Sequence, residues 1–176
     1  MELLKAIEMR KSTRSYKPEQ ISDESLDTIL KAGYAAPVGM NDYNSVHITV
    51  VQNSNLLDKL TDATKDFFEN TRINTFYGAP TVAIVSGKPS EKAPGVEAHN
   101  AACIVENMSL AATDLGLGSV YLMGFLFAIS NNKELLAELN LPEGFVPVAA
   151  LAIGYSTEDL TEEDSTKHTI ETNIIK

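Results

Sequence analysis

The sequence predicts a layered domain of the α/β or α+β class. Helical segments alternate with about four strands along the chain, which is the pattern of a sheet covered by helices. Hydrophobic residues make up 44% of the 176 residues and charged residues 22%, the balance of a folded globular protein. A chain of this length can bury a substantial core. Because it has no internal repeat, low-complexity tract or long linker, we expect one continuous domain over residues 1–176.

The N-terminal part predicts two helices and a loop. Residues 2–9 place three leucine and isoleucine side chains on one face, which indicates a short amphipathic helix. Ser22, followed by two acidic residues, is a typical helix start, and this second helix continues to Gly33. Pro37 and Gly39 then keep the next segment in a loop.

The middle of the chain predicts a strand, a helix and a second strand. Residues 46–51 are mostly β-branched, which favours a strand. Asn53 or Ser54 caps the following helix, whose apolar face extends to Phe67. Residues 79–87 are an apolar run that indicates a buried strand closed by a glycine.

Residues 97–115 predict the longest and most apolar helix. A helix that is apolar on most sides is buried in a core or against another subunit, and its alanines permit close approach of a partner helix. Within it, Cys103 is interpreted as a small core residue rather than a nucleophile. The predicted apolar stripe comprises Ala98, Ala101, Ala102, Val105, Met108, Ala112 and Leu115.

The C-terminal part predicts two further strands, at residues 119–124 and 145–156, with a short helix at 132–139 between them. The Gly116-Leu117-Gly118 stretch follows a helix and precedes a strand. That order is the reverse of the strand, glycine turn and helix of a dinucleotide-binding motif, so the stretch is interpreted as a helix end and turn.

The charge balance excludes several classes of function. With 24 acidic and 14 basic residues, the net charge of −10 argues against nucleic-acid and anionic-membrane binding. No apolar run reaches the roughly 18 residues of a membrane span, and the N-terminus lacks the features of a secretory signal. The single cysteine excludes an internal disulfide, so the expected location is the cytoplasm. The three histidines are far apart and indicate no metal-binding pair.

One short segment is basic despite this balance. Residues 10–17, RKSTRSYK, hold four cations, and no carboxylate lies between Glu8 and Glu19. Two guanidinium groups, a hydroxyl and the backbone N–H groups of a chain turn would suit a phosphate dianion. The alternative is a solvated basic helix end that interacts favourably with the helix dipole. The spacing alone leaves both readings open. We call residues 10–14 the basic island.

The sequence RKSTRSY resembles the Arg-Arg-Ser-x-Arg-x-Phe signature near the N-terminus of the nitroreductase family of FMN-dependent oxidoreductases. AAPVGMN, at residues 35–41, resembles the family's Ala-Pro-Ser-x-x-Asn loop, and GAPTVAIV resembles its second strand. AACIVENMSLAATDLGLGSVYLMG is similar to its central helix, turn and next strand, and AALAIGY to its last core strand. These stretches cover almost the whole chain in the family's order.

The resemblance implies an α+β sandwich with a central, mostly antiparallel sheet flanked by helices. It implies a homodimer formed through the long helices, with two FMN molecules at the subunit interface. The implied enzyme is an NAD(P)H-dependent flavin oxidoreductase that passes a hydride by a ping-pong route through FMN to a nitroaromatic, a quinone or a similar small acceptor. No side chain is then expected to be catalytic, because the flavin carries the chemistry and Arg14 and Gly124 tune it.

Carried over position by position, the resemblance also implies the FMN contacts. A cation beside the N1/O2 edge of the ring matters because negative charge develops there on reduction. The implied contacts are Arg10, Lys11, Ser12 and Lys167 at the phosphate; Arg14 near N1/O2; Met123 and Gly124 near N5; and, from the partner subunit, Pro37, Val38, Gly39 and Asn41.

The sequence departs from the family pattern at several positions. Val38 replaces the serine of the loop, and Tyr43-Asn44-Ser45 stand where Gln-Pro-Trp is common. A late arginine that commonly meets the phosphate is absent, and Lys167 is its nearest counterpart. Two alternative functions stay open: an FMN reservoir without NAD(P)H turnover, and a specialised flavin-dependent reductase such as a dehalogenase.

Overall fold

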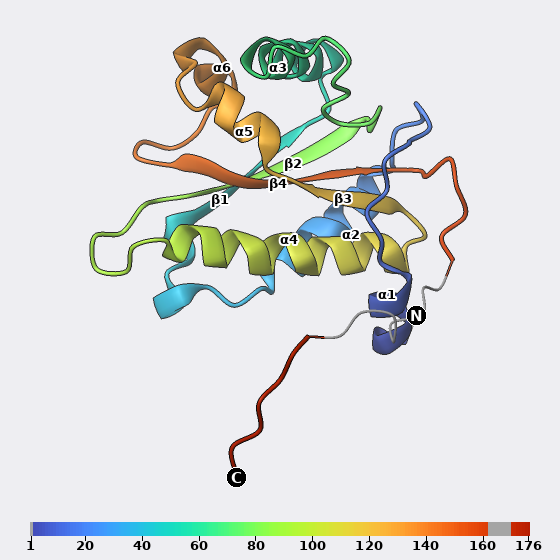
Figure 1. Ribbon diagram of the computed structural model, residues 1–176, viewed down its shortest axis with the longest axis vertical. Coiled ribbons are helices and arrows are strands. Elements are labelled where there is room, and N and C mark those ends of the chain that lie inside the picture. Colours follow the sequence, from blue (N-terminus) through green and yellow to red (C-terminus); the bar gives the residue numbers. More distant parts are fainter. Residues whose placement is uncertain (1, 162–169) are drawn as a thin grey trace.

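The protein is described by a computed structural model that covers residues 2–161 and 170–176. Within these residues, four strands form one sheet in the order β1-β2-β4-β3 (Figure 1). All three neighbouring pairs are antiparallel, which confirms the expected mostly antiparallel sheet and leaves β1 and β3 at its edges. The strands are β1 (Val46–Val51), β2 (Thr81–Gly87), β3 (Gly118–Leu122) and β4 (Val146–Gly154).

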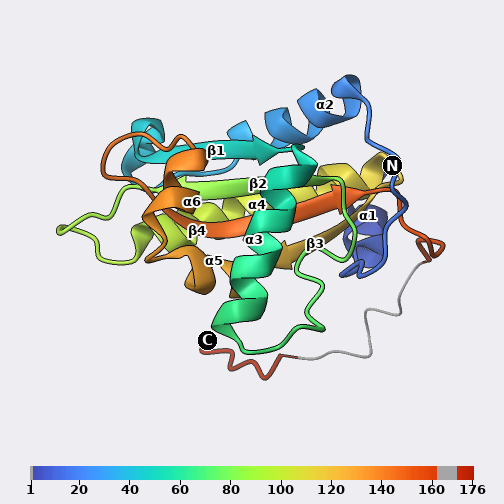
Figure 2. The same ribbon diagram turned by 90° about the horizontal axis from the view of Figure 1, so that it is seen from above.

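Helices cover both faces of this sheet (Figures 1 and 2). One face carries α3 (Ser54–Phe67), α5 (Gly124–Ile129) and α6 (Lys133–Glu138). The other carries α2 (Asp23–Tyr34) and α4 (Val96–Asp114), with α1 (Leu3–Met9) against α4. The expected α+β sandwich is therefore confirmed. None of the helices in the two described ranges has the length and apolar character needed to cross a membrane.

Strand β2 is buried along its whole length and separates two apolar clusters. Val82 and Ile84 belong to the cluster formed with α3 and α5, whereas Ala83 and Val85 belong to the cluster formed with α2 and α4. This division follows from the alternation of side chains along a strand. It explains why the sequence of β2 is apolar without interruption.

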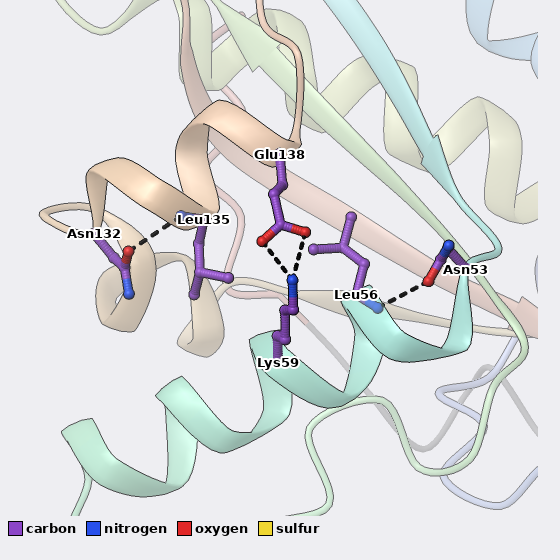
Figure 3. A network of polar contacts seen from close by, with 6 residues as sticks. All are labelled: Asn53, Leu56, Lys59, Asn132, Leu135 and Glu138. Atoms are coloured by element: carbon purple, nitrogen blue, oxygen red, sulfur yellow. Dashed lines mark hydrogen bonds and ion pairs between the residues drawn. The ribbon is translucent and has the colours of Figure 1, made fainter.

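Side-chain caps begin three of the helices. Ser22 accepts a hydrogen bond from the Ser25 N–H at the start of α2. Asn53 and Asn132 do the same for α3 and α6, at 3.0 and 3.1 Å (Figure 3). Between the last two caps, the Lys59 ammonium contacts both carboxylate oxygens of Glu138 at 2.8 and 3.0 Å, joining α3 to α6.

Helix α5 was not expected, and the strand predicted over residues 119–124 ends earlier, at Leu122. Met123 has φ −133° and ψ −29°, which ends the extended conformation, and α5 begins at the next residue without a side-chain cap. Phe125 and Ile129 are buried. A six-residue apolar segment without a cap carries no sequence signal that separates helix from strand.

The predicted stripe on α4 is only partly buried. Ala101, Val105, Met108 and Ala112 lie in the core as expected. Ala98, Ala102 and Leu115 are exposed in the single chain, so their burial against another subunit stays a prediction; the interpretation of Cys103 as a core residue is wrong, because it is exposed. Alanine is accommodated on buried and exposed surfaces alike, so a helix rich in alanine does not define its buried face by composition.

Candidate functional site

The backbone of the basic island is fixed to the sheet. Helix α1 ends at Met9, and the Arg10 N–H donates to the Ala6 carbonyl at 2.9 Å. From there the chain is extended, and the Thr13 N–H donates to the Ser119 carbonyl of edge strand β3 at 2.9 Å. Further along, the Lys17 N–H donates to the Tyr155 carbonyl at 2.8 Å. The island is therefore held by main-chain bonds at its centre and beyond its end.

The Gly116-Leu117-Gly118 turn makes this attachment possible in two ways. Gly116 has φ +73°, a left-handed conformation that favours glycine at the end of a helix. Gly118 instead leaves room for the Thr13 side chain. A Cβ added at Gly118 would lie 2.7 Å from Thr13 Oγ1 and 2.8 Å from Thr13 Cγ2. Thr13 is buried, and its hydroxyl has no partner among the described residues. The interpretation of this stretch as a helix end and turn is confirmed.

The charged side chains of the island point outward and are loosely paired. Arg10 Nε lies 3.7 Å from Glu106 Oε1, and the Arg10 side chain is 36% exposed. The Lys11 ammonium donates to the Asp159 carbonyl at 3.1 Å. The exposed Arg14 guanidinium contacts the Ser12 carbonyl at 3.5 Å, the outer limit of a hydrogen bond. Arg10, Lys11, Ser12 and Arg14 thus share one extended segment, a cationic surface, but their side chains have different neighbours, since Arg10 lies toward Glu106 of α4 and Lys11 toward Asp159.

Tyr16 anchors the C-terminal side of the island. Its ring is 7% exposed, and its hydroxyl donates to the Ala152 carbonyl of β4 at 3.4 Å. Burial raises the pKa of the Tyr16 phenol well above its usual value of 10.0; nearby Tyr77 raises it further, and Arg14 lowers it. The phenol is consequently neutral at physiological pH.

Met123 and Gly124 lie at the far end of β3 from the island contact. Met123 is 47% exposed, and a Cβ added at Gly124 would meet nothing within 4 Å. Gly124 lies five positions after Ser119, a span of at most about 16 Å in extended chain. Burial raises the pKa of Tyr121 on the intervening strand. A single edge strand thus connects the cationic surface to an open backbone position.

The Pro37–Asp42 loop lies elsewhere. Its Gly39 N–H donates to Asn100 Oδ1 at 2.8 Å, near the start of α4. The island lies nearer the other end of α4, since Ser119 Oγ contacts Ser109 Oγ at 2.8 Å. Nine residues of helix span about 14 Å. Figure 1 likewise shows the loop and α1 toward opposite ends of α4. One chain does not bring Pro37, Val38, Gly39 and Asn41 to the island.

Sequence reasoning missed two contacts of this region, the packing of Thr13 on Gly118 and the bond from Gly39 to Asn100. Asn100 is 5% exposed, and a polar residue in a predominantly apolar helix is the signal that could have indicated it. Lys167 lies outside the described residues. Among the residues that are described, no group of three or more histidine, cysteine, aspartate or glutamate side chains could hold a metal ion.

Comparison with known proteins gives consistent matches over most of the chain. The sequence profile described as "Nitroreductase family" matches residues 7–155. A relative from Archaeoglobus fulgidus, provisionally named NADH dehydrogenase/NAD(P)H nitroreductase, is 32% identical over 158 residues, or 90% of this chain and 87% of the relative. A relative with the same name from Methanothermobacter thermautotrophicus is 30% identical, covering 90% of this chain and 80% of its own length.

Two solved structures show the same fold over nearly their whole length. The structure of a nitroreductase with bound FMN from Bacteroides fragilis has 31% sequence identity and a TM-score of 0.80, covering 98% of this chain and 100% of that chain. An FMN-dependent nitroreductase from Clostridium difficile has 26% identity and a TM-score of 0.84, with 99% of each chain covered.

Proposed function

The chain belongs to the nitroreductase family, and from this premise we propose that it is an FMN-dependent NAD(P)H oxidoreductase. It would transfer a hydride from the nicotinamide to a small electron acceptor such as a nitroaromatic or a quinone. The names of the relatives support NAD(P)H as the hydride donor, and the FMN named for the similar structures supports FMN as the cofactor.

The observation that carries the proposal is the donor set of the basic island. Two guanidinium groups, an ammonium and the Ser12 hydroxyl lie within five residues of a chain whose net charge is −10. Their backbone is fixed on β3, whereas the Arg10 ion pair, at 3.7 Å and partly solvated, is weak and easily replaced. Of these, Arg10, Ser12 and the backbone of Lys11 fit a phosphate dianion, and Arg14 is left for the ring. A contribution of Lys167 to the same phosphate stays a prediction.

The ring end of the cofactor would lie toward Met123 and Gly124. The open space at Gly124 leaves its backbone accessible to a flat ligand. When bound, FMN would supply the ring that accepts and passes on the hydride. The residues of this chain would bind and orient that ring, and Arg14 would hold a positive charge beside its N1/O2 edge.

The position of Arg14 can be tested by redox potentiometry at saturating FMN. Arg14→Ala should lower the midpoint potential of the bound flavin, by about 30 mV for each tenfold loss of preference for the reduced form. Arg10→Ala is the control, because a cation at the phosphate is remote from the ring. An unchanged midpoint potential in Arg14→Ala, or a larger drop in Arg10→Ala, would contradict the assignment of Arg14 to the ring and Arg10 to the phosphate.

The site would be completed by a second subunit. Because the Pro37–Asp42 loop and the island lie toward opposite ends of α4, a two-fold dimer could bring the loop of one chain to the island of the other. The exposed Ala98, Ala102 and Cys103 of α4 and the exposed leucines of α1 offer an apolar surface for such contact. Light scattering should report a dimer at micromolar concentration; a stable FMN-loaded monomer would contradict this.

The function is tested by the absorption spectrum of the purified protein. We expect a yellow protein that releases FMN, and whose bound flavin bleaches anaerobically on addition of NADH or NADPH. A protein that stays colourless after FMN is added would rule out the proposal. A bound flavin that neither nicotinamide reduces would favour the reservoir function instead.

A further inference from the structure

The Pro37–Asp42 loop is attached to the body of the protein through Gly39. The Gly39 N–H donates to Asn100 Oδ1 at 2.8 Å, and Asn100 is 5% exposed. The backbone of Gly39 also packs directly on α4, because a Cβ added there would lie 2.7 Å from Val96 Cγ2. Val96 and Asn100 are one helical turn apart on α4, so both contact the backbone of Gly39.

The loop has little other support in the described part of the chain. Its remaining hydrogen bonds are local, such as those from the Asn41 N–H to the Val38 carbonyl and from the Asp42 N–H to the Gly39 carbonyl, at 3.0 and 3.3 Å. A cavity of about 490 Å³ adjoins the loop at Val38. A second, of about 590 Å³, is lined by Gly39, Met40 and Asp42. The loop therefore stands between two cavities and is held where it meets Asn100.

The loop conformation needs such an anchor. Met40 has φ +58° and Asn41 has φ +55°, so two consecutive residues other than glycine adopt the left-handed conformation. Asparagine tolerates this conformation, but methionine rarely adopts it. Residues in sparsely populated conformations persist when surrounding contacts fix them, and such residues cluster at functional sites. The Met40 side chain is 69% exposed, so its own packing does not supply that fixation.

We propose that Asn100 is a positioning residue, which holds the Pro37–Asp42 loop in its left-handed conformation and so fixes how Asn41 faces the flavin ring. This inference rests on the proposed function, in which the loop lines the ring of FMN bound to the partner subunit. Asn100 itself touches the loop and not the cofactor. Substitution of Asn100 should therefore weaken binding of the flavin ring without changing the contacts to the phosphate.

The experiment compares the affinities of FMN and riboflavin for the full-length chain by titration. Asn100→Leu keeps the number and branching of the side-chain heavy atoms but has no acceptor for the Gly39 N–H. We expect it to weaken both ligands by the same factor, tenfold or more, with the ratio of the two affinities unchanged. Asn100→Asp keeps an acceptor oxygen and should stay within about threefold of the native protein. At saturation, the absorption spectrum of flavin bound to Asn100→Leu should shift toward that of free flavin.

The matched control is Asn107→Leu. Asn107 lies on the same helix, and its side-chain amide donates to the Ala32 carbonyl of α2 at 3.1 Å. This variant also loses one bond from an asparagine side chain to the backbone, but not to the loop, so both flavin affinities should stay within twofold of native. Circular dichroism must show every variant folded at the temperature of the titration. If Asn100→Leu does not fold, Asn100→Ser replaces it, since serine adds no bulk and is too short to reach Gly39.

The positioning role would be overturned by native affinities in the folded Asn100 variant, by an equal loss in Asn107→Leu, or by an Asn100→Asp protein as weak as Asn100→Leu. A loss confined to FMN would place the effect at the phosphate and would also overturn it. A native chain that binds neither ligand would instead refute the proposed function, so the two failures are distinguishable.

Discussion

The basic island and the Pro37–Asp42 loop are built in opposite ways. In the island the backbone is bonded to β3 and the charged side chains point outward with weak partners. In the loop the Met40 side chain is exposed, and the buried Asn100 side chain of α4 holds the backbone at Gly39. The first arrangement suits recognition of charge, and the second suits contact with a flat apolar ring. Substitutions in the two segments should therefore have different effects on flavin binding and on stability.

The largest expected effect concerns the side chains of the island. Arg10→Ala should weaken FMN binding by about 1.5 to 3 kcal/mol, the scale of a charge-assisted hydrogen bond. Riboflavin has no phosphate, so its affinity should not change. Lys17→Ala is the matched control, because it removes the same charge from the same segment outside the expected contacts. Isothermal titration of both ligands measures the effects, and an equal loss for riboflavin would place Arg10 at the ring.

A somewhat smaller effect concerns the backbone of the island. Gly118→Ala should lower the free energy of unfolding by about 1 to 3 kcal/mol, the range for overpacking, because the new Cβ would overlap the side chain of Thr13. Thr13→Ala removes the two nearest of the three close atoms, leaving Cβ at 3.0 Å, and should restore much of that stability in the double variant. Urea denaturation of the four proteins gives the coupling energy.

Gly116→Ala is the control for this cycle. A Cβ at Gly116 would meet nothing within 4 Å, so its effect comes from the positive φ alone and should be independent of Thr13. If the effects of Gly118→Ala and Thr13→Ala on the free energy of unfolding were additive, Thr13 would not pack against Gly118.

Most of the fold could be predicted because its signals are local. Strand β1 has the predicted bounds, since five of its six residues are β-branched. Helices α2 and α3 begin next to Ser22 and Asn53, whose side chains cap them. Helix α5 could not be predicted, because its conformation depends on the apolar cluster that buries Phe125 and not on a capping signal.

In the candidate site, too, the local features could be predicted and the long-range contacts could not. The donors of the island lie within five consecutive residues, so their proximity needs no knowledge of the fold. The anchor of the loop joins Gly39 to a residue 61 positions away, and Thr13 meets Gly118 across an even longer separation. Such pairs depend on how α4 and β3 pack against the rest of the chain. A single sequence contains no periodic pattern that specifies them.

The smallest effect at neutral pH concerns Tyr16, the anchor at the end of the island. Its hydroxyl bond to Ala152 is long, at 3.4 Å, so Tyr16→Phe should change stability at pH 7 by less than about 1 kcal/mol. The effect should appear at alkaline pH. Because burial raises the pKa of Tyr16 above 10.0, the folded protein keeps a proton that the unfolded chain releases above pH 10. Stability should then fall with rising pH, by up to about 1.4 kcal/mol per pH unit.

Tyr16→Phe should flatten this alkaline decline, leaving the part that comes from other groups such as Tyr121, whose pKa is also raised. Arg14→Ala should leave the slope unchanged up to pH 11, because the folded Tyr16 already keeps its proton there, and should extend the decline to higher pH, since the Arg14 cation lowers the pKa of Tyr16. Tyr34→Phe, at an exposed tyrosine, controls for the loss of one phenol. Urea denaturation between pH 8 and pH 11, by circular dichroism, measures the slopes. If Tyr16→Phe declined as steeply as the native protein, the buried phenol would not anchor the island, and the segment would be held by its main-chain bonds to β3 and to the residues that follow β4.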